Sequence, residues 1–192
     1  LNNTVLCLFE DKDKNIWLGL DDGLSILNLD SPFSVYNDIK GIIGTVYTSI
    51  IFQDNLYVGT NQGLFYKPYN SEKKLQIVEN TQGQVWCLKI IDNTLFCGHN
   101  SGTFVVKNDS ALKISDFSGT WDIKKVSTNQ NILLQGNYNG LSILEKVNNN
   151  WKFRNKIEGF NISSRFVELI NENELLINHE YDGIFKLKLN SE

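Results

Sequence analysis

Short apolar runs alternate with polar turns along the whole chain, and one turn pattern returns five times. Each copy has a β-prone apolar run, a polar turn that ends in glycine, and a second apolar run. The turns end at Gly23, Gly63, Gly102, Gly140 and Gly183. Their spacing of about 40 residues is typical of the blades of a β-propeller. The pattern therefore predicts a repeat protein made of β-strands.

The glycine that closes each turn is a backbone requirement. Asp22-Gly23 and Asn139-Gly140, each between strand-like runs, are among the strongest short signals for a β-hairpin. Such a turn needs a positive φ, which costs a residue with a Cβ about 1–2 kcal/mol and costs glycine nothing. The repeated glycine thus indicates a hairpin in every repeat and says nothing about chemistry.

The repeats predict an all-β fold, a β-propeller of about five four-stranded blades. The blade repeats run roughly over 1–40, 41–80, 81–116, 117–160 and 161–192. A fourth strand is expected at 33–36 in the first repeat, whereas the fifth repeat has no fourth strand after Leu189, and the residues before Val5 are too few to supply it. We therefore expect residues 1–192 to be a single propeller domain or part of one, cut from a larger, seven-bladed propeller. A closed five-bladed ring is the alternative.

Composition narrows the function classes. The chain has 192 residues, 41% of them hydrophobic, and a net charge of −4 with its basic residues scattered. Nucleic-acid binding is therefore not expected. No apolar run reaches the roughly eighteen residues that a membrane helix needs. The chain contains no methionine, so we interpret it as an excised segment and expect any export signal to lie outside it.

The three cysteines are interpreted as small buried hydrophobic residues. They are Cys7, Cys87 and Cys97. A two-residue turn at Asp92-Asn93 places Leu88, rather than Cys87, opposite Cys97. Since successive strand residues point to opposite faces, a Cys87–Cys97 disulfide is not expected.

No metal and no other cofactor is expected. Acidic residues alternate in the turn 11–15 as in an EF-hand loop, but the glycine and glutamate that complete such a loop are absent. His99 and His179 fall at neighbouring positions of two turns. A metal site would need more ligands than the sequence offers near them, so we interpret both as turn residues.

Two sets of loops should meet at one end of a propeller: the loops that precede the innermost strands and the turns that end in glycine. An aromatic residue follows the first kind of loop in four repeats, at Tyr47, Trp86, Trp121 and Phe166. These rings either pack between blades or line the channel mouth and stack against a ligand. Tyr138 and Tyr181 occupy equivalent turn positions and are expected to be more exposed.

Polar residues surround these rings in the predicted arrangement. Amides such as those of Asn61, Asn100 and Asn139 suit the hydroxyls of a neutral oligosaccharide, although they are also ordinary turn residues. Arg165 is either a bidentate clamp for a ligand carboxylate or a surface residue without such a role. The candidate ligand-binding residues are therefore Trp86, Trp121, Tyr138, Tyr181, Arg165, Asn61, Asn100 and Asn139.

The stretch VLCLFEDKDKNIWLGLDDGL, from Val5 to Leu24, resembles the repeat of the two-component regulator propellers. The second repeat is similar, whereas later repeats lack the tryptophan, and Lys14 and His179 stand at positions where the family has glycine. The resemblance implies a periplasmic sensor segment of a bacterial membrane-spanning regulator. It also implies a neighbouring propeller, a β-sandwich, a membrane helix and a histidine kinase or helix-turn-helix output domain outside these residues. Members of the family often sense polysaccharide breakdown products.

The sequence thus favours a non-catalytic, ligand-sensing propeller whose partner is a small molecule or an oligosaccharide. One alternative is a scaffold that binds a protein or forms a homodimer through its blade edges. A second is an enzyme that cleaves glycans. Arg154 and Arg165 are too few for the arginine cluster of a sialidase-type site. The spacing of Glu168, Glu180 and Asp182 selects no acid–base pair.

Overall fold

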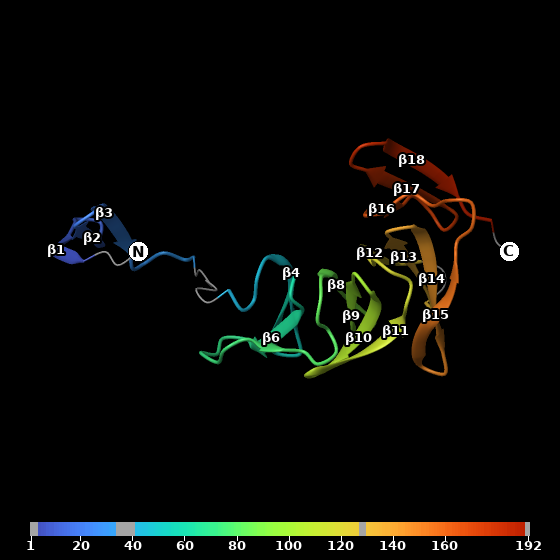
Figure 1. Ribbon diagram of the computed structural model, residues 1–192, viewed down its shortest axis with the longest axis horizontal. Coiled ribbons are helices and arrows are strands. Elements are labelled where there is room, and N and C mark those ends of the chain that lie inside the picture. The colour runs from blue at the N-terminus through green and yellow to red at the C-terminus, as the bar shows by residue number, and fades with distance from the viewer. Residues whose placement is uncertain (1–3, 34–40, 127–129, 191–192) are drawn as a thin grey trace. The chain divides into compact units, whose positions relative to one another are not determined.

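The computed structural model describes residues 4–33, 41–126 and 130–190, and the regular structure of these residues is entirely β-strand. The strands form five antiparallel sheets of three or four strands, which we call blades one to five in chain order. The chain divides into two compact units, Leu1–Ile39 and Lys40–Glu192. The first unit contains blade one and the second contains blades two to five (Figure 1).

Blade one consists of β1 (Val5–Glu10), β2 (Asn15–Leu20) and β3 (Gly23–Asn28), paired in the order β1-β2-β3. The predicted fourth strand at 33–36 lies largely outside the described residues. Cys7 is exposed, so its predicted burial is wrong. The reason is that, among the described residues of this unit, no second sheet covers the faces of blade one.

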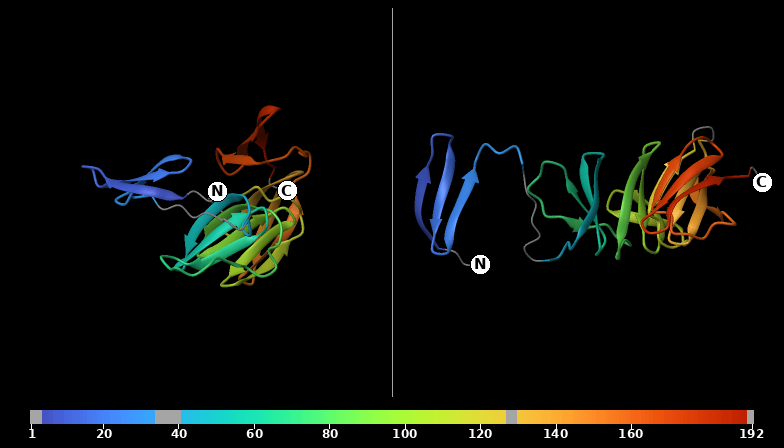
Figure 2. Two further views of the ribbon diagram at one scale, coloured as in Figure 1. Left: turned by 60° about the vertical axis from the view of Figure 1, so that its left-hand side comes forward. Right: turned by 90° about the horizontal axis from the view of Figure 1, so that it is seen from above.

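The second unit holds four sheets, which lie side by side (Figures 1 and 2). Blade two is β4 (Val46–Phe52), β5 (Asn55–Thr60), β6 (Leu64–Pro68) and β7 (Gln76–Ile77), and blade three is β8 (Val85–Ile91), β9 (Thr94–His99), β10 (Gly102–Lys107) and β11 (Ser110–Ser115). Blade four is β12 (Asp122–Lys125), β13 (Ile132–Asn137), β14 (Gly140–Val147) and β15 (Asn150–Lys156), and blade five is β16 (Phe166–Leu169), β17 (Glu174–His179) and β18 (Gly183–Lys188). Among the described residues blade five thus has three strands, and the expectation that its fourth is missing is confirmed.

Hairpin turns with positive φ fix the strand registers within each blade. Asp92 and Asn93 have φ values of 47° and 56°, which gives the turn the right-handed twist of its two strands. This register pairs Leu88 with Cys97, as the sequence predicts. Cys87 and Cys97 are buried free thiols, so the expected absence of a bridge between them agrees with the pairing that the structure shows.

Apolar side chains fill the spaces between successive blades of the second unit. Fully buried examples are Leu64 and Leu95 between blades two and three, Phe96 and Leu133 between blades three and four, and Leu141 and Ile177 between blades four and five. Each such side chain contributes about 1.5–3 kcal/mol relative to an exposed one. Because the sheets stack face to face, the innermost strands β4, β8, β12 and β16 follow one another around one side of the unit.

In blades two to four the repeated turn begins with a glycine, Gly59, Gly98 or Gly136, that the next blade requires. A Cβ on Gly98 would lie 2.5 Å from the carbonyl oxygen of Thr120, and a Cβ on Gly136 would lie 2.0 Å from that of Ser164. Neither glycine has a positive φ, so close approach is the reason for both. The sequence analysis explained only the second glycine of the pattern, at Gly102 and Gly140, where φ is 134° and 91°.

Candidate functional site

The loops before the innermost strands meet the repeated turns at one end of the second unit. Within a blade, the backbone N–H of Asn100 donates to the carbonyl of Gln84 at 2.9 Å. Between blades, the N–H of Thr120 donates to the carbonyl of His99 at 3.0 Å, and that of Ser164 donates to Asn137 at 2.9 Å. The structure therefore brings together the two sets of loops that the sequence places around the channel mouth.

Three aromatic rings from successive blades stack on one another at this end, and we call them the aromatic arc. The centroids of Tyr47 and Trp86 are 5.0 Å apart, and those of Trp86 and Trp121 are 4.5 Å apart. Tyr47 is 43% exposed, and both tryptophans are half-buried. The rings therefore form a platform that solvent reaches, rather than an interior layer between blades.

A break in the strand register aims two of these rings. In β4 the pairing with β5 shifts between Val46 and Thr48, and in β8 the pairing with β9 shifts between Val85 and Cys87. The residue at each shift is therefore Tyr47 or Trp86. A β-bulge leaves one residue outside the regular alternation and re-directs its side chain. The residues on either side of the bulge keep their hydrogen-bonded pairing with the next strand, while the aromatic ring turns toward the neighbouring blade.

Tyr138, from the turn between β13 and β14, joins the arc from blade four. Its hydroxyl accepts a hydrogen bond of 2.7 Å from the indole Nε1 of Trp86, and its ring meets Trp121 edge-on at 5.1 Å. The ring lies on Gly119, where a Cβ would be 1.9 Å from the Tyr138 Cγ. Burial raises the pKa of the Tyr138 phenol above its ordinary value, so the hydroxyl is protonated at neutral pH. Tyr138 is 36% exposed, so it is less free than the sequence suggests.

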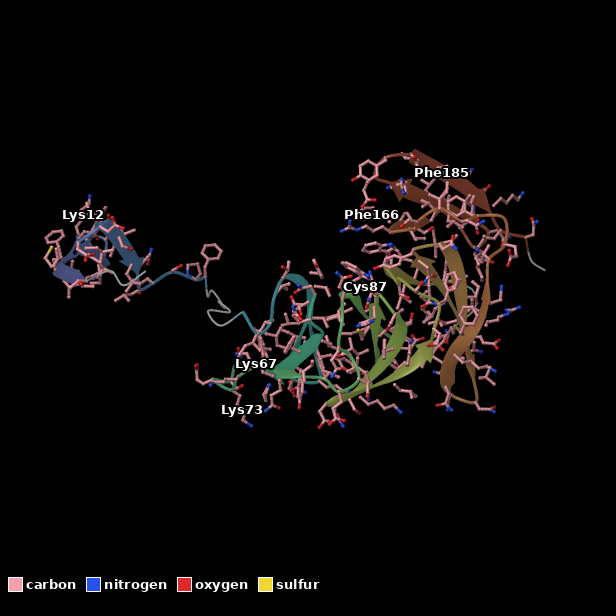
Figure 3. The ribbon with its side chains drawn as sticks, in the orientation of Figure 1. Lys12, Lys67, Lys73, Cys87, Phe166 and Phe185 are labelled. Carbon is pink, nitrogen blue, oxygen red and sulfur yellow. The ribbon has the colours of Figure 1, made fainter. Side chains whose placement is uncertain are left out.

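Arg165 extends the arc into blade five. Its guanidinium carbon lies 5.0 Å from the ring centroid of Trp121 and 5.3 Å from that of Phe166. The sequence places Phe166 in the aromatic series, but the contact with Trp121 is made by Arg165, the residue before it. Phe166 instead begins strand β16, where it pairs with Asn178 (Figure 3 labels Phe166).

A carboxylate occupies one edge of that guanidinium. Arg165 Nη1 donates to Glu180 Oε1 at 2.8 Å. This hydrogen bond lowers the pKa of Glu180, so the carboxylate is ionised at neutral pH. The sequence offered two alternatives for Arg165, a clamp for a ligand carboxylate or a surface residue without a role. Neither alternative included the ion pair with Glu180.

The predicted amides have different surroundings from the rings. Asn61 Oδ1 accepts from the backbone N–H of Thr45 at 2.7 Å, and Asn100 Oδ1 accepts from that of Gln84 at 3.3 Å. These two side chains therefore tie each turn to the loop of its own blade. Asn139 is exposed in the turn of blade four.

Tyr181 projects from the turn of blade five. It is 91% exposed, and the described ring nearest to it in an aromatic pair is His179, at 6.1 Å. Of the eight predicted residues, the structure thus gathers Trp86, Trp121, Tyr138 and Arg165 in one cluster. It leaves Tyr181 and the three amides outside that cluster.

A buried polar network includes Thr120, the residue before Trp121, and the sequence did not predict this network. Thr120 Oγ1 lies 2.8 Å from Thr103 Oγ1 and accepts from Asn137 Nδ2 at 3.2 Å. Gln135 Nε2 donates to Ser142 Oγ at 3.0 Å. All five side chains are fully buried. The available signal was Gln135 and Ser142, which are polar residues at strand positions where the other repeats are mostly apolar.

The cluster is partly exposed to solvent. A hollow of about 650 Å³ lies elsewhere, along 154–160 and 186–190, and contains none of the eight predicted residues. Among the described residues, no group of three or more histidine, cysteine, aspartate or glutamate side chains is arranged to hold a metal ion. The described part of the chain also contains no helix that is long and apolar enough to cross a bilayer.

Residues 1–22 match the family model described as "Two component regulator propeller". The first repeat is thus similar to the repeat of the two-component regulator propellers. The match covers the repeat on which the sequence resemblance was based, and it ends at Asp22, one residue before the glycine that closes the turn. A comparison with curated proteins gave no match.

Solved structures share the fold of this chain. The extracellular domain of a protein described as a hybrid two component system from B. thetaiotaomicron is 18% identical over 95% of this chain, with a TM-score of 0.60. That of a one component system from the same organism is 18% identical over 96%, with a TM-score of 0.55. The chain spans 26% and 28% of these two domains. The WD40 β-propeller domain of Doa1 is 16% identical over 96% of this chain, of which the chain spans 61%, with a TM-score of 0.56. These likenesses establish the β-propeller fold.

Proposed function

We propose that this chain is a ligand-sensing segment of a bacterial membrane-spanning regulator and that it binds oligosaccharides at the aromatic arc. The observation that carries the proposal is a row of partly exposed rings, Tyr47, Trp86 and Trp121, that spans three blades. Aromatic faces next to hydrogen-bonding groups are suited to molecules with one apolar and one polar side, and sugar rings are such molecules.

The family match supports a role in signalling. The first repeat belongs to a regulator propeller, and two similar structures are extracellular domains of proteins described as two component or one component systems. We propose the same placement for this chain, on the periplasmic side of the inner membrane. Under this proposal a neighbouring propeller and a β-sandwich adjoin it in the intact protein, and the whole propeller has seven blades.

Binding by the full 192-residue chain tests the ligand. Isothermal titration calorimetry with a panel of neutral and acidic tetrasaccharides is expected to give binding to at least one member. Trp121→Ala is expected to weaken that binding about tenfold or more, because the central ring of the platform is removed. Tyr69→Ala is the matched control, since Tyr69 is an exposed aromatic residue in the loop that follows β6.

Two results would count against the proposal. One is a panel in which no tetrasaccharide binds the native chain. The other is equal loss of affinity in the Trp121 and Tyr69 variants, which would place the ligand away from the arc. Protease accessibility of the intact regulator from the periplasmic side of spheroplasts tests the placement separately.

The second candidate function is a scaffold that binds another protein or a second copy of the chain. Blade five favours it, because Tyr181 and Ile184 are among its most exposed side chains. Sedimentation of the chain at increasing concentration distinguishes a homodimer from a monomer.

Release of shorter saccharides from the same tetrasaccharide panel would instead favour a glycan-cleaving enzyme.

A further inference from the structure

The ion pair between Arg165 and Glu180 lies at the blade-five end of the aromatic arc. Its guanidinium contacts Trp121, and its carboxylate comes from the turn that follows β17. Both side chains are well exposed to solvent, so a molecule seated on Trp121 has access to both. We infer that this pair determines specificity and selects neutral saccharides with a vicinal diol over saccharides that carry a carboxylate. The inference rests on the proposed function.

The local charge opposes a ligand carboxylate. Glu180 and Asp182 lie two residues apart in one turn, and Arg165 is the cation that pairs with Glu180. Around the inner strands, Lys124 pairs with Glu168 at 3.1 Å and with Asp122 at 3.6 Å, and Asp122 also pairs with Lys89, so the charges of this group balance. A ligand carboxylate that reached Arg165 would lie near Glu180, which already neutralises the guanidinium, and near Asp182 of the same turn. Like charges at such separations disfavour each other even when water screens them.

The hydrogen-bonding capacity of the pair matches a diol. A guanidinium has five N–H donors, and a carboxylate has about four acceptor positions. One hydrogen bond joins them, from Nη1 of Arg165 to Oε1 of Glu180. Adjacent sugar hydroxyls both donate and accept, so they can bond to the carboxylate and the guanidinium together. A uronate carboxylate only accepts, so it cannot bond to Glu180, whereas the C6 hydroxyl that it replaces can donate to it.

The ring contacts set the position of the diol. Arg165 lies against the faces of both Trp121 and Phe166, which limits the directions that its planar group can take. Trp121 is itself fixed by a hydrogen bond of 3.1 Å from its Nε1 to Ser163 Oγ. A sugar whose C–H face rests on the exposed part of Trp121 thus meets donors and acceptors at its rim.

Matched ligands test the inference. Calorimetry on the full chain compares each neutral tetrasaccharide that binds with the same tetrasaccharide oxidised at C6 to the uronate. The native chain is expected to bind the neutral member roughly tenfold or more tightly, because the uronate carboxylate lies near Glu180 and Asp182 and cannot donate a hydrogen bond to either. Glu180→Gln removes that charge while keeping the side-chain size, and it is expected to reduce or reverse the preference. Glu174→Gln, in the same blade and paired with Lys186, is the matched control and is expected to leave the preference unchanged.

The outcomes separate the two proposals. If neither member of any pair binds, the proposed function fails and this inference fails with it. If the native chain binds saccharides but prefers the uronates, the inference alone is overturned. An unchanged preference in Glu180→Gln, with Trp121→Ala still weakening binding about tenfold or more, would also overturn it while leaving the proposed function intact.

Discussion

The hydroxyl of Tyr138 accepts a 2.7 Å hydrogen bond from the indole N–H of Trp86 and thereby links the turn of blade four to the innermost strand of blade three. In blades two and three the same turn position is held by Asn61 and Asn100, which bond to the loop of their own blade. The exchange of asparagine for tyrosine therefore changes the partner. The turn of blade four gives up a bond within its own blade and gains one to its neighbour.

Replacing Tyr138 with phenylalanine is expected to remove this bond and keep the ring. Because the hydroxyl is partly exposed, the expected loss in the free energy of unfolding is about 1 kcal/mol or less. The tryptophan fluorescence of the folded chain should also change, since the Trp86 N–H then faces water. Urea denaturation and an emission spectrum measure the two effects. Tyr181→Phe, at the equivalent turn position and 91% exposed, should change neither.

Substitutions at two glycines isolate the contact beneath Tyr138. Gly119 and Gly159 have similar backbone angles, with φ of 74° and 85°, so alanine at either position costs about 1–2 kcal/mol in strain. A Cβ at Gly119 would also strike the Tyr138 ring, whereas one at Gly159 meets nothing within 4 Å. Gly119→Ala is therefore expected to lose at least about 1 kcal/mol more than Gly159→Ala in the free energy of unfolding. Equal losses would mean that the ring moves away at no cost.

The three cysteines are expected to differ in their reactivity. Cys7 is exposed and should react rapidly with a disulfide reagent at pH 8. Cys87 and Cys97 are buried, and burial raises the pKa of Cys87 to about 12 and that of Cys97 well above its ordinary value. These two should react only through local opening. Thiol counting should give one fast group in the native chain and three after denaturation, and Cys7→Ser should abolish the fast phase.

The same burial predicts a loss of stability at alkaline pH. Once the pH exceeds about 9, the thiols of the unfolded chain ionise while those of the native chain stay protonated. The unfolded state then releases protons that the native state keeps, so the free energy of unfolding falls as the pH rises toward 12. A Cys87→Ala variant, measured by urea denaturation between pH 8 and about 10.5, is expected to show a smaller fall. An identical fall in both proteins would contradict the role of Cys87.

His99 predicts a loss of stability on the acid side. Burial, with a smaller effect from nearby Lys113, lowers its pKa from 6.5, and its Nδ1 accepts from the backbone N–H of Ser101 at 3.0 Å. Below pH 6.5 the unfolded chain therefore binds a proton that the native chain does not, and stability falls as the pH falls. For one proton the slope is at most about 1.4 kcal/mol per pH unit. His99→Gln should flatten the stability curve between about pH 6.5 and 5, and an unchanged slope would contradict the prediction.

The sequence predicted the fold correctly where a residue type has a single structural role, as glycine has in a turn with positive φ. A glycine that closes a turn at positive φ returned in all five repeats, so the sheets and their order followed from it. The register that pairs Leu88 with Cys97 followed from the length of a two-residue turn. The convergence of loops and turns at one end of the blades followed from the strand order, and backbone hydrogen bonds such as that from Thr120 to His99 bear it out.

The site was less predictable because it depends on shifts of a single residue. Counting along the repeats aligned Phe166 with Trp121, yet Arg165 makes the contact with the Trp121 ring. A bulge in β8 decides where Trp86 points, and no composition signal marks a bulge. The contact of Tyr138 with Gly119 joins two residues that a repeat alignment treats separately. The burial predicted for Cys7 was wrong because the sequence shows that cysteine is a small apolar residue but does not show whether a second sheet covers its strand.

The ring of Tyr138 packs against Gly119 and is also partly exposed to solvent. A molecule that draws this ring away from Trp86 would leave the indole N–H without this acceptor and would remove the ring from Gly119. The packing of the loop that precedes β12 therefore depends on a side chain that also faces the surroundings, so a contact made outside the fold can reach its backbone.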